Sequence, residues 1–125
     1  MHTLEGLDVY NLSQSFSDKI WKIVIKWDKF AQYGLGKQMT NAADSISSNI
    51  AEGYGRYFIK ENINFCFYSR GSMLETKNWL QKCVNRNLIA KEEYEQLIEE
   101  LGIIHRKLNA YVKVLKSNLT KNSLK

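Results

Sequence analysis

The sequence predicts an all-α fold, in which four helices form an antiparallel up-down bundle within one domain that covers residues 1–125. Apolar residues recur at spacings of three and four over four long segments, which is typical of amphipathic helices. The chain contains no proline, and long uninterrupted helices tolerate that absence best. The segments between the helices are short, which favours neighbours that run in opposite directions.

The first half of the chain is expected to form two of these helices. The first covers residues 7–27, where one apolar stripe follows helical spacing. Residues 29–36 are expected to be a connection, because Gly34 and Gly36 interrupt helices. The central helix is expected over residues 37–52, and Gly53 and Gly55 follow it as a turn. The stripe of the first helix comprises Val9, Leu12, Phe16, Ile20, Ile23 and Trp27.

The second half is expected to form helices over residues 58–85 and 91–119. Apolar side chains occupy two faces of the third helix, and one face of the fourth. A helix with two apolar faces must be buried on two sides, and one four-helix bundle of this size covers two sides only partly. We therefore expect copies of this chain to associate into a closed ring. Gly71 lies inside the third helix, where glycine costs about 1 kcal/mol relative to alanine. We therefore expect the third and central helices to approach closely there.

A group of polar residues lies along the central and third helices. Acids and arginines on adjoining helices could form an active site, but such groups more often form a buried hydrogen-bonded network that fixes helix packing. We expect the structural role, with Glu52 or Asp44 paired to Arg56 or Arg70. The six residues of this polar network are Asp44, Asn49, Glu52, Arg56, Arg70 and Glu75.

Catalytic and metal sites are not expected. Bundle di-iron proteins use Glu-x-x-His, whereas Gly102 stands three residues before His105, and His2 is terminal. Cys66 and Cys83 are far apart and are expected to be small apolar packing residues in a reducing compartment. The chain contains no Gly-x-Ser-x-Gly nucleophile motif and no phosphate-binding loop. The sequence therefore predicts a protein that is not an enzyme, without cofactor or metal.

The chain has a net charge of +5, which permits an acidic partner without requiring one. Lysines line one face of the first helix; the ordinary interpretation is a solvated face, and the alternative is an anion-binding ridge. No membrane span or secretory signal is recognisable, so we expect a cytoplasmic protein. The candidate nucleic-acid-binding residues are Lys19, Lys22, Lys26, Lys29, Lys37, Arg56 and Lys60.

The run Asn-Ile-Ala-Glu-Gly-Tyr-Gly-Arg at residues 49–56 carries a resemblance, together with Gln38, the residues Ala-Ala-Asp-Ser-Ile at 42–46 and Gly-Ser-Met-Leu-Glu at 71–75. The chain resembles a bacterial four-helix-bundle family from Leu7 to about Leu115. That family includes proteins encoded by intervening sequences of large-subunit ribosomal RNA genes and the accessory protein of diversity-generating retroelements. Unlike many members, this chain has no proline in the first connection and has Arg70 in place of a small residue.

The resemblance implies a ring, typically a homopentamer, without known catalysis. It also suggests two kinds of partner, because the retroelement member contacts a reverse transcriptase and nucleic acid. The expected function is a non-catalytic homo-oligomeric scaffold that binds RNA or a ribonucleoprotein through basic faces. The alternative is a protein-binding assembly module without a nucleic-acid role.

Overall fold

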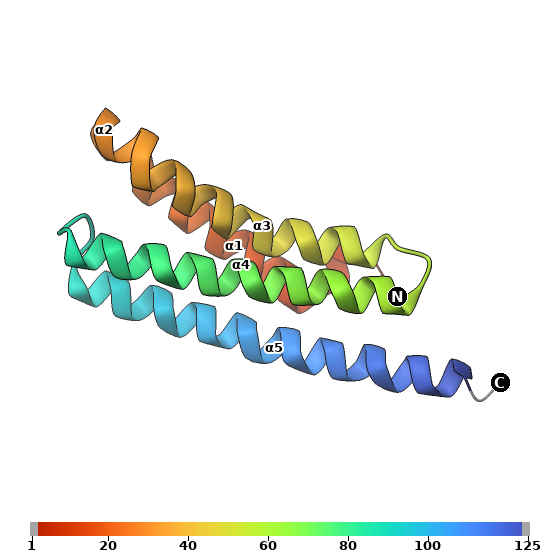
Figure 1. The fold of residues 1–125 in the computed structure, drawn as a ribbon. Coiled ribbons are helices and arrows are strands. Elements are labelled where there is room, and N and C mark those ends of the chain that lie inside the picture. Colours follow the sequence, from red (N-terminus) through yellow and green to blue (C-terminus); the bar gives the residue numbers. More distant parts are fainter. Residues whose placement is uncertain (1–2, 124–125) are drawn as a thin grey trace.

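Four long helices lie side by side along one axis in the computed structural model, which describes residues 3–123 (Figure 1). No strand occurs in that range. The long helices are α1 (Asp8–Val24), α3 (Lys37–Tyr54), α4 (Ile59–Asn85) and α5 (Lys91–Ser123). Three short elements accompany them: η1 (Leu4–Gly6), α2 (Lys29–Ala31) and η2 (Gln32–Gly36).

The helices pack around one apolar core, and α3 packs against α4 more extensively than α1 does against α5. Each long helix contributes fully buried side chains, because its apolar residues recur on the face that meets its neighbours. On α5 the apolar face expected from the sequence is buried at Leu97, Leu101, Ile104, Leu108 and Leu115. The largest fully buried side chains elsewhere include Phe16 and Ile20 from α1, Met39, Ile46 and Ile50 from α3, and Leu80 from α4.

The connection expected at residues 29–36 is instead helical. Asp28 caps α2 by accepting a hydrogen bond from the Ala31 amide to its Oδ1 at 3.0 Å, and the π-helical turn η2 leads directly into α3. Gly36 does not interrupt the helix: a Cβ there would lie 2.6 Å from Cγ1 of Val24. Glycine therefore allows the end of α1 to pack closely on this turn, and that packing outweighs its low helix propensity.

The prediction that α3 and α4 approach each other closely at Gly71 is wrong. A Cβ at Gly71 would meet no atom within 4 Å, and the residue is exposed. The close approach lies at Gly53, where a Cβ would be 2.7 Å from Oδ1 of Asn62 and 2.8 Å from Cβ of Phe65. Further along the same contact, the hydroxyl of Ser69 donates to the carbonyl oxygen of Ile46 at 2.8 Å. Small side chains thus bring α3 and α4 together at two other positions.

Candidate nucleic-acid interface

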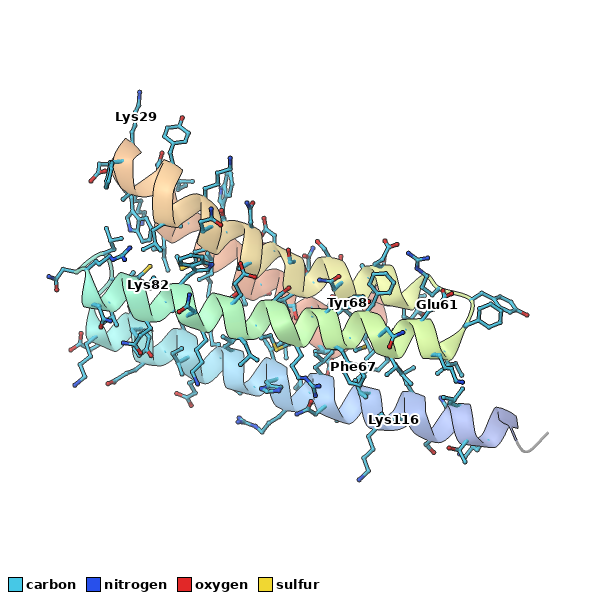
Figure 2. The ribbon with its side chains drawn as sticks, in the orientation of Figure 1. Lys29, Glu61, Phe67, Tyr68, Lys82 and Lys116 are labelled. Carbon is cyan, nitrogen blue, oxygen red and sulfur yellow. The ribbon has the colours of Figure 1, made fainter. Side chains whose placement is uncertain are left out.

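The end of the molecule where α1 leads into α2 and α3 is strongly basic. Residues 19–43, which we call the basic end, contain five lysines and one aspartate, so they carry a net charge of +4. Four of these lysines are exposed and form no ion pair with any residue of the described range 3–123: Lys22, Lys26, Lys29 and Lys37. Lys29 extends outward from α2 at the extremity of the molecule (Figure 2).

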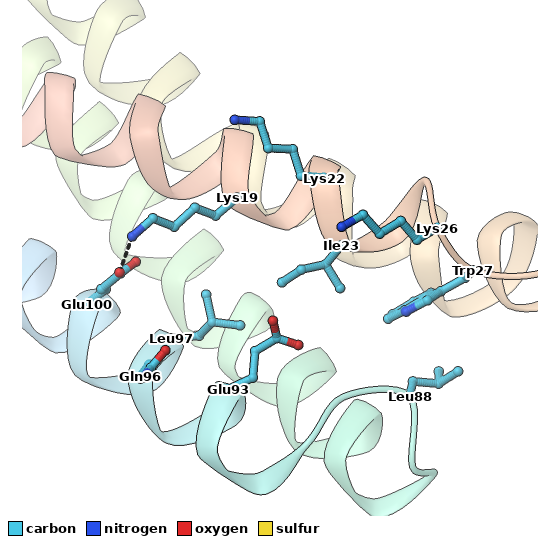
Figure 3. A pocket seen from close by; sticks show the side chains of 10 residues that line it. All are labelled: Lys19, Lys22, Ile23, Lys26, Trp27, Leu88, Glu93, Gln96, Leu97 and Glu100. Atoms are coloured by element: carbon cyan, nitrogen blue, oxygen red, sulfur yellow. Dashed lines mark hydrogen bonds and ion pairs between the residues drawn. The ribbon is translucent and has the colours of Figure 1, made fainter.

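A groove of about 490 Å³ separates the basic side of α1 from the start of α5 (Figure 3). Lys19 reaches across it and forms an ion pair with Glu100, whereas Lys22 and Lys26 stay on the α1 side. The charge of Lys19 is therefore partly neutralised within the chain. The rest of the groove is lined by Ile23, Trp27, Leu88, Glu93, Gln96 and Leu97.

Exposed aromatic side chains accompany the lysines of the basic end. Trp21 is 57% exposed, Phe30 92% and Tyr33 74%. Trp21 and Tyr33 line one cleft of about 370 Å³ between α1, η2 and the start of α3, which also contains Lys37. Lysines interleaved with exposed aromatic rings are typical of surfaces that bind single-stranded nucleic acid. These aromatic residues were not among the predicted site residues. Trp21 was expected within the first helix, and Phe30 and Tyr33 were expected in the connection over residues 29–36.

Arg56 and Lys60 do not belong to the basic end. They flank the turn between α3 and α4, at the opposite end of the molecule (Figure 1). The 18 residues of α3 separate the two ends by about 27 Å. Arg56 is also engaged: its Nη2 lies 2.6 Å from Oε1 of Glu52, and its guanidinium lies 4.8 Å from the ring centroid of Phe65. The seven candidate cations therefore form two separate groups.

The expected buried polar network is not formed within one chain. Asp44 and Glu75 are exposed, and Asn49 donates to the Ser45 carbonyl oxygen of its own helix at 2.8 Å. Arg70 stacks over the ring of Phe67, with 4.8 Å from guanidinium carbon to ring centroid. The pair Glu52–Arg56 does form, but its two side chains are 55% and 41% exposed.

The geometry of α3 explains this difference. Residues spaced by three and four drift around an α-helix by about 20° every seven residues. Along the row of α3 residues with this spacing, Ala42 is buried, Asn49 is half-buried, and Glu52 and Arg56 are exposed. The row therefore leaves the helix interface before it reaches its charged members.

A small polar layer between α1 and α3 was not predicted. The Ser47 hydroxyl donates to Oε1 of Gln14 at 2.7 Å, and both Ser13 and Ser17 are buried. Partial burial, reinforced by the nearby Asp18 carboxylate, raises the pKa of Asp44, although a hydrogen bond from Ser17 opposes the shift. In the sequence, only the spacing of four between Ser13 and Ser17 on α1 indicates this polar layer.

Two cysteines and one tyrosine in the core have raised pKa values. Cys66 and Cys83 are buried free thiols, and burial raises the pKa of each to about 11. Burial also raises the pKa of Tyr111, whose hydroxyl accepts a hydrogen bond from Nδ2 of Asn62 at 3.0 Å and so joins α4 to α5. Thiolates are the reactive form of cysteine, so these thiols are suited to packing and not to nucleophilic chemistry.

The described part of the chain offers no cluster of three metal-binding side chains. Within residues 3–123, no helix combines the length and apolar character needed to cross a bilayer.

Residues 5–110 match the family model described as 23S rRNA-intervening sequence protein. A similar solved structure is that of a protein with unknown function from the S23 ribosomal protein family of Bacteroides thetaiotaomicron VPI-5482, determined at 1.70 Å. The two share 24% sequence identity and a TM-score of 0.76, over 84% of this chain and 95% of the other, which indicates a shared fold. No curated protein sequence matches. Because the family model spans most of its length, the chain belongs to the family of 23S rRNA-intervening sequence proteins.

Proposed function

We propose that this protein is a non-catalytic, homo-oligomeric cytoplasmic scaffold that binds RNA or a ribonucleoprotein through its basic end. The observation that carries the proposal is the local excess of positive charge: residues 19–43 contain five lysines and one aspartate and so carry +4. Four lysines of that region are exposed and are not engaged in ion pairs among residues 3–123. Exposed aromatic rings lie beside them, so the surface offers both cations for phosphates and rings for bases.

Binding at such a surface is driven mainly by release of counterions from the RNA, so affinity should fall steeply with salt. Residues 19–43 contain no strand, and so no aromatic β-sheet that would recognise a base sequence. Sequence preference should therefore be weak. A nucleic-acid-handling protein, such as a reverse transcriptase, is a partner that could add specificity.

Assembly into a ring, with the antiparallel up-down bundle as its unit and a homopentamer as the proposed form, would repeat the basic end around an axis. Residues 91–100 contain five glutamates and one lysine, so the start of α5 carries −4 at the same end of the molecule. The contact that closes the ring would be head-to-tail, since such contacts close into rings when the rotation permits. Apolar side chains exposed on α4, among them Leu74 at 61%, would gain from burial in that contact.

The second candidate is a protein-binding assembly module without a nucleic-acid role. The observation that favours it is the acidic wall opposite the lysines, where Glu100 engages Lys19 and Glu93 lines the same groove. An acidic wall repels phosphate but can contact a basic protein surface.

The two functions are separated by fluorescence anisotropy titrations with a structured RNA at about 50 and 200 mM salt. The test variant is Lys22→Glu/Lys26→Glu. Its matched control is Lys113→Glu/Lys121→Glu, which makes the same change in net charge on exposed residues of α5. RNA binding that the test variant loses and the control retains supports the proposal. No binding by the unmodified protein at low salt would favour the protein-binding module. Equal loss in both variants would contradict binding through the basic end, because overall charge would then account for the RNA affinity.

A further inference from the structure

We propose that the cleft between Trp21 and Tyr33, here called the aromatic cleft, binds an unpaired base of RNA. The inference rests on the proposed function and adds to it a preference for single-stranded RNA over duplex. Base stacking, in addition to charge, would then hold the RNA at the basic end. The cleft is lined by Trp21, Val24, Ile25, Gln32, Tyr33, Lys37, Thr40 and Asn41.

The π-helical turn η2 shapes this cleft. A π turn contains one residue more than an α turn, and one extra residue rotates the following side chains by about 100° around the helix axis. The turn starts at Gln32, and Gln32 and Tyr33 line the cleft together with Trp21 and Ile25 from the end of α1. Such π turns occur frequently at functional sites. The end of α1 and the turn η2 thus each place one aromatic ring in the same cleft.

The lining supplies each kind of contact that an unpaired nucleotide requires. Trp21 and Tyr33 are 57% and 74% exposed, so their ring faces are available for stacking. Gln32 donates from Nε2 to the Ile25 carbonyl oxygen at 2.9 Å, which leaves its Oε1 available to accept from a base. The Asn41 side-chain amide makes no hydrogen bond to any residue in the range 3–123, and Lys37 supplies a cation for a phosphate.

The size and charge of the cleft favour RNA over a second copy of this chain. Its volume of about 370 Å³ lies in the range of clefts that bind small ligands, and a nucleotide is such a ligand. No acidic residue lines it, whereas Lys37 does and the surrounding basic end carries +4. The centres of protein interfaces are depleted of lysine, whereas this cleft contains Lys37 and three uncharged polar side chains, Gln32, Thr40 and Asn41.

The test uses the full chain, whose fold and mass are checked by circular dichroism and sedimentation. Binding of a fluorescent single-stranded RNA of about ten nucleotides is measured for the unmodified protein and for Trp21→Ala, Trp21→Phe and Tyr57→Ala. A second ligand is the same ribose-phosphate chain without bases. Tyr57 is the matched control, because it is a 91% exposed aromatic residue at the opposite end of the molecule.

We expect Trp21→Ala to weaken binding of the base-containing RNA by about five- to 150-fold, the range associated with stacking of one base on one ring. Trp21→Phe retains a ring and should recover most of that loss, and Tyr57→Ala should bind like the unmodified protein. Binding of the abasic chain should be weaker and insensitive to Trp21→Ala.

Three outcomes would overturn the inference. Equal affinity for both ligands, with no effect of Trp21→Ala, would leave charge-driven binding intact and remove the stacking site. A lower assembly mass for Trp21→Ala would identify the cleft as an interface between copies of this chain. No binding of either ligand at low salt would reject the proposed function together with the stacking site.

Discussion

Replacement of two glycines by alanine should change stability in opposite directions, although both lie in helices. Gly53 is buried at the contact of α3 with α4, where an added Cβ would lie 2.7 Å from Oδ1 of Asn62, 2.8 Å from Cβ of Phe65 and 3.0 Å from the Asn62 carbonyl oxygen. Gly71 is exposed on α4, and an added Cβ would meet nothing within 4 Å. The added methyl group therefore meets closely packed atoms at Gly53 and open space at Gly71.

The magnitudes follow from helix propensity and packing. Alanine is better than glycine inside a helix by roughly 0.5–1 kcal/mol, so Gly71→Ala should raise the free energy of unfolding by about that amount. At Gly53 the helices must separate, because two of the three close atoms belong to a Cβ and a backbone carbonyl. Overpacking of this kind costs about 1–3 kcal/mol and exceeds the propensity gain. Displacement of Asn62 would also disturb its hydrogen bond to Tyr111.

The assay is urea unfolding followed by circular dichroism at one protein concentration, since association shifts apparent stability. We expect Gly53→Ala to be less stable than the unmodified protein and Gly71→Ala to be more stable, with the two variants about 2 kcal/mol apart. A Gly53→Ala variant as stable as the unmodified protein would refute the close approach of α3 and α4. A less stable Gly71→Ala would show that another surface covers that residue.

Three further predictions concern charges and thiols. Glu52→Ala should lower the free energy of unfolding by less than about 0.5 kcal/mol in thermal melts, because its exposed ion pair joins residues four apart on one helix. Burial and Asp18 raise the folded-state pKa of Asp44 above 3.8, so protonation stabilises the folded state and the charged form destabilises it. Asp44→Asn should therefore raise the melting temperature at pH 7. The gain should vanish well below pH 3.8, where the carboxyl is protonated in both the folded and the unfolded state; an equal gain at pH 7 and at that low pH would contradict the raised pKa. Cys66 and Cys83 should resist alkylation at pH 8 until urea unfolds the chain, because each pKa is about 11, and rapid labelling of the folded protein would show that the thiols are accessible.

Helix positions were largely predictable from the sequence, because core burial imposes a periodic pattern on each long helix. The predicted central helix over residues 37–52 is observed as Lys37–Tyr54, and the fourth helix extends to Ser123 instead of ending at 119. The helical nature of residues 32–36 was not predictable from local propensity. Gly36 reads as an interruption, but its lack of a Cβ is what permits contact with Val24 from α1. That contact depends on tertiary packing and leaves no periodic signal.

The candidate site was predicted in part. The lysine stripe of the first helix indicated a basic surface, and Lys22 and Lys26 are exposed as expected. Arg56 was grouped with them because it flanks a connection, yet the length of α3 places it at the other end. The aromatic cleft was not predicted, because Trp21 and Tyr33 lie on two different elements, α1 and η2, whose packing has no sequence signal. Neighbourhood in sequence therefore predicts a helix face well and a site built from several elements poorly.

The salt dependence of RNA affinity tests the role of the basic end most directly. The logarithm of the association constant is measured against the logarithm of salt concentration for the unmodified protein and for Lys22→Gln/Lys26→Gln. Each lysine–phosphate contact contributes about 0.7–0.9 to the slope, so loss of two contacts should make the slope shallower by about 1.4–1.8 for each subunit that touches the RNA. An unchanged slope and affinity in the variant would contradict RNA binding through this surface.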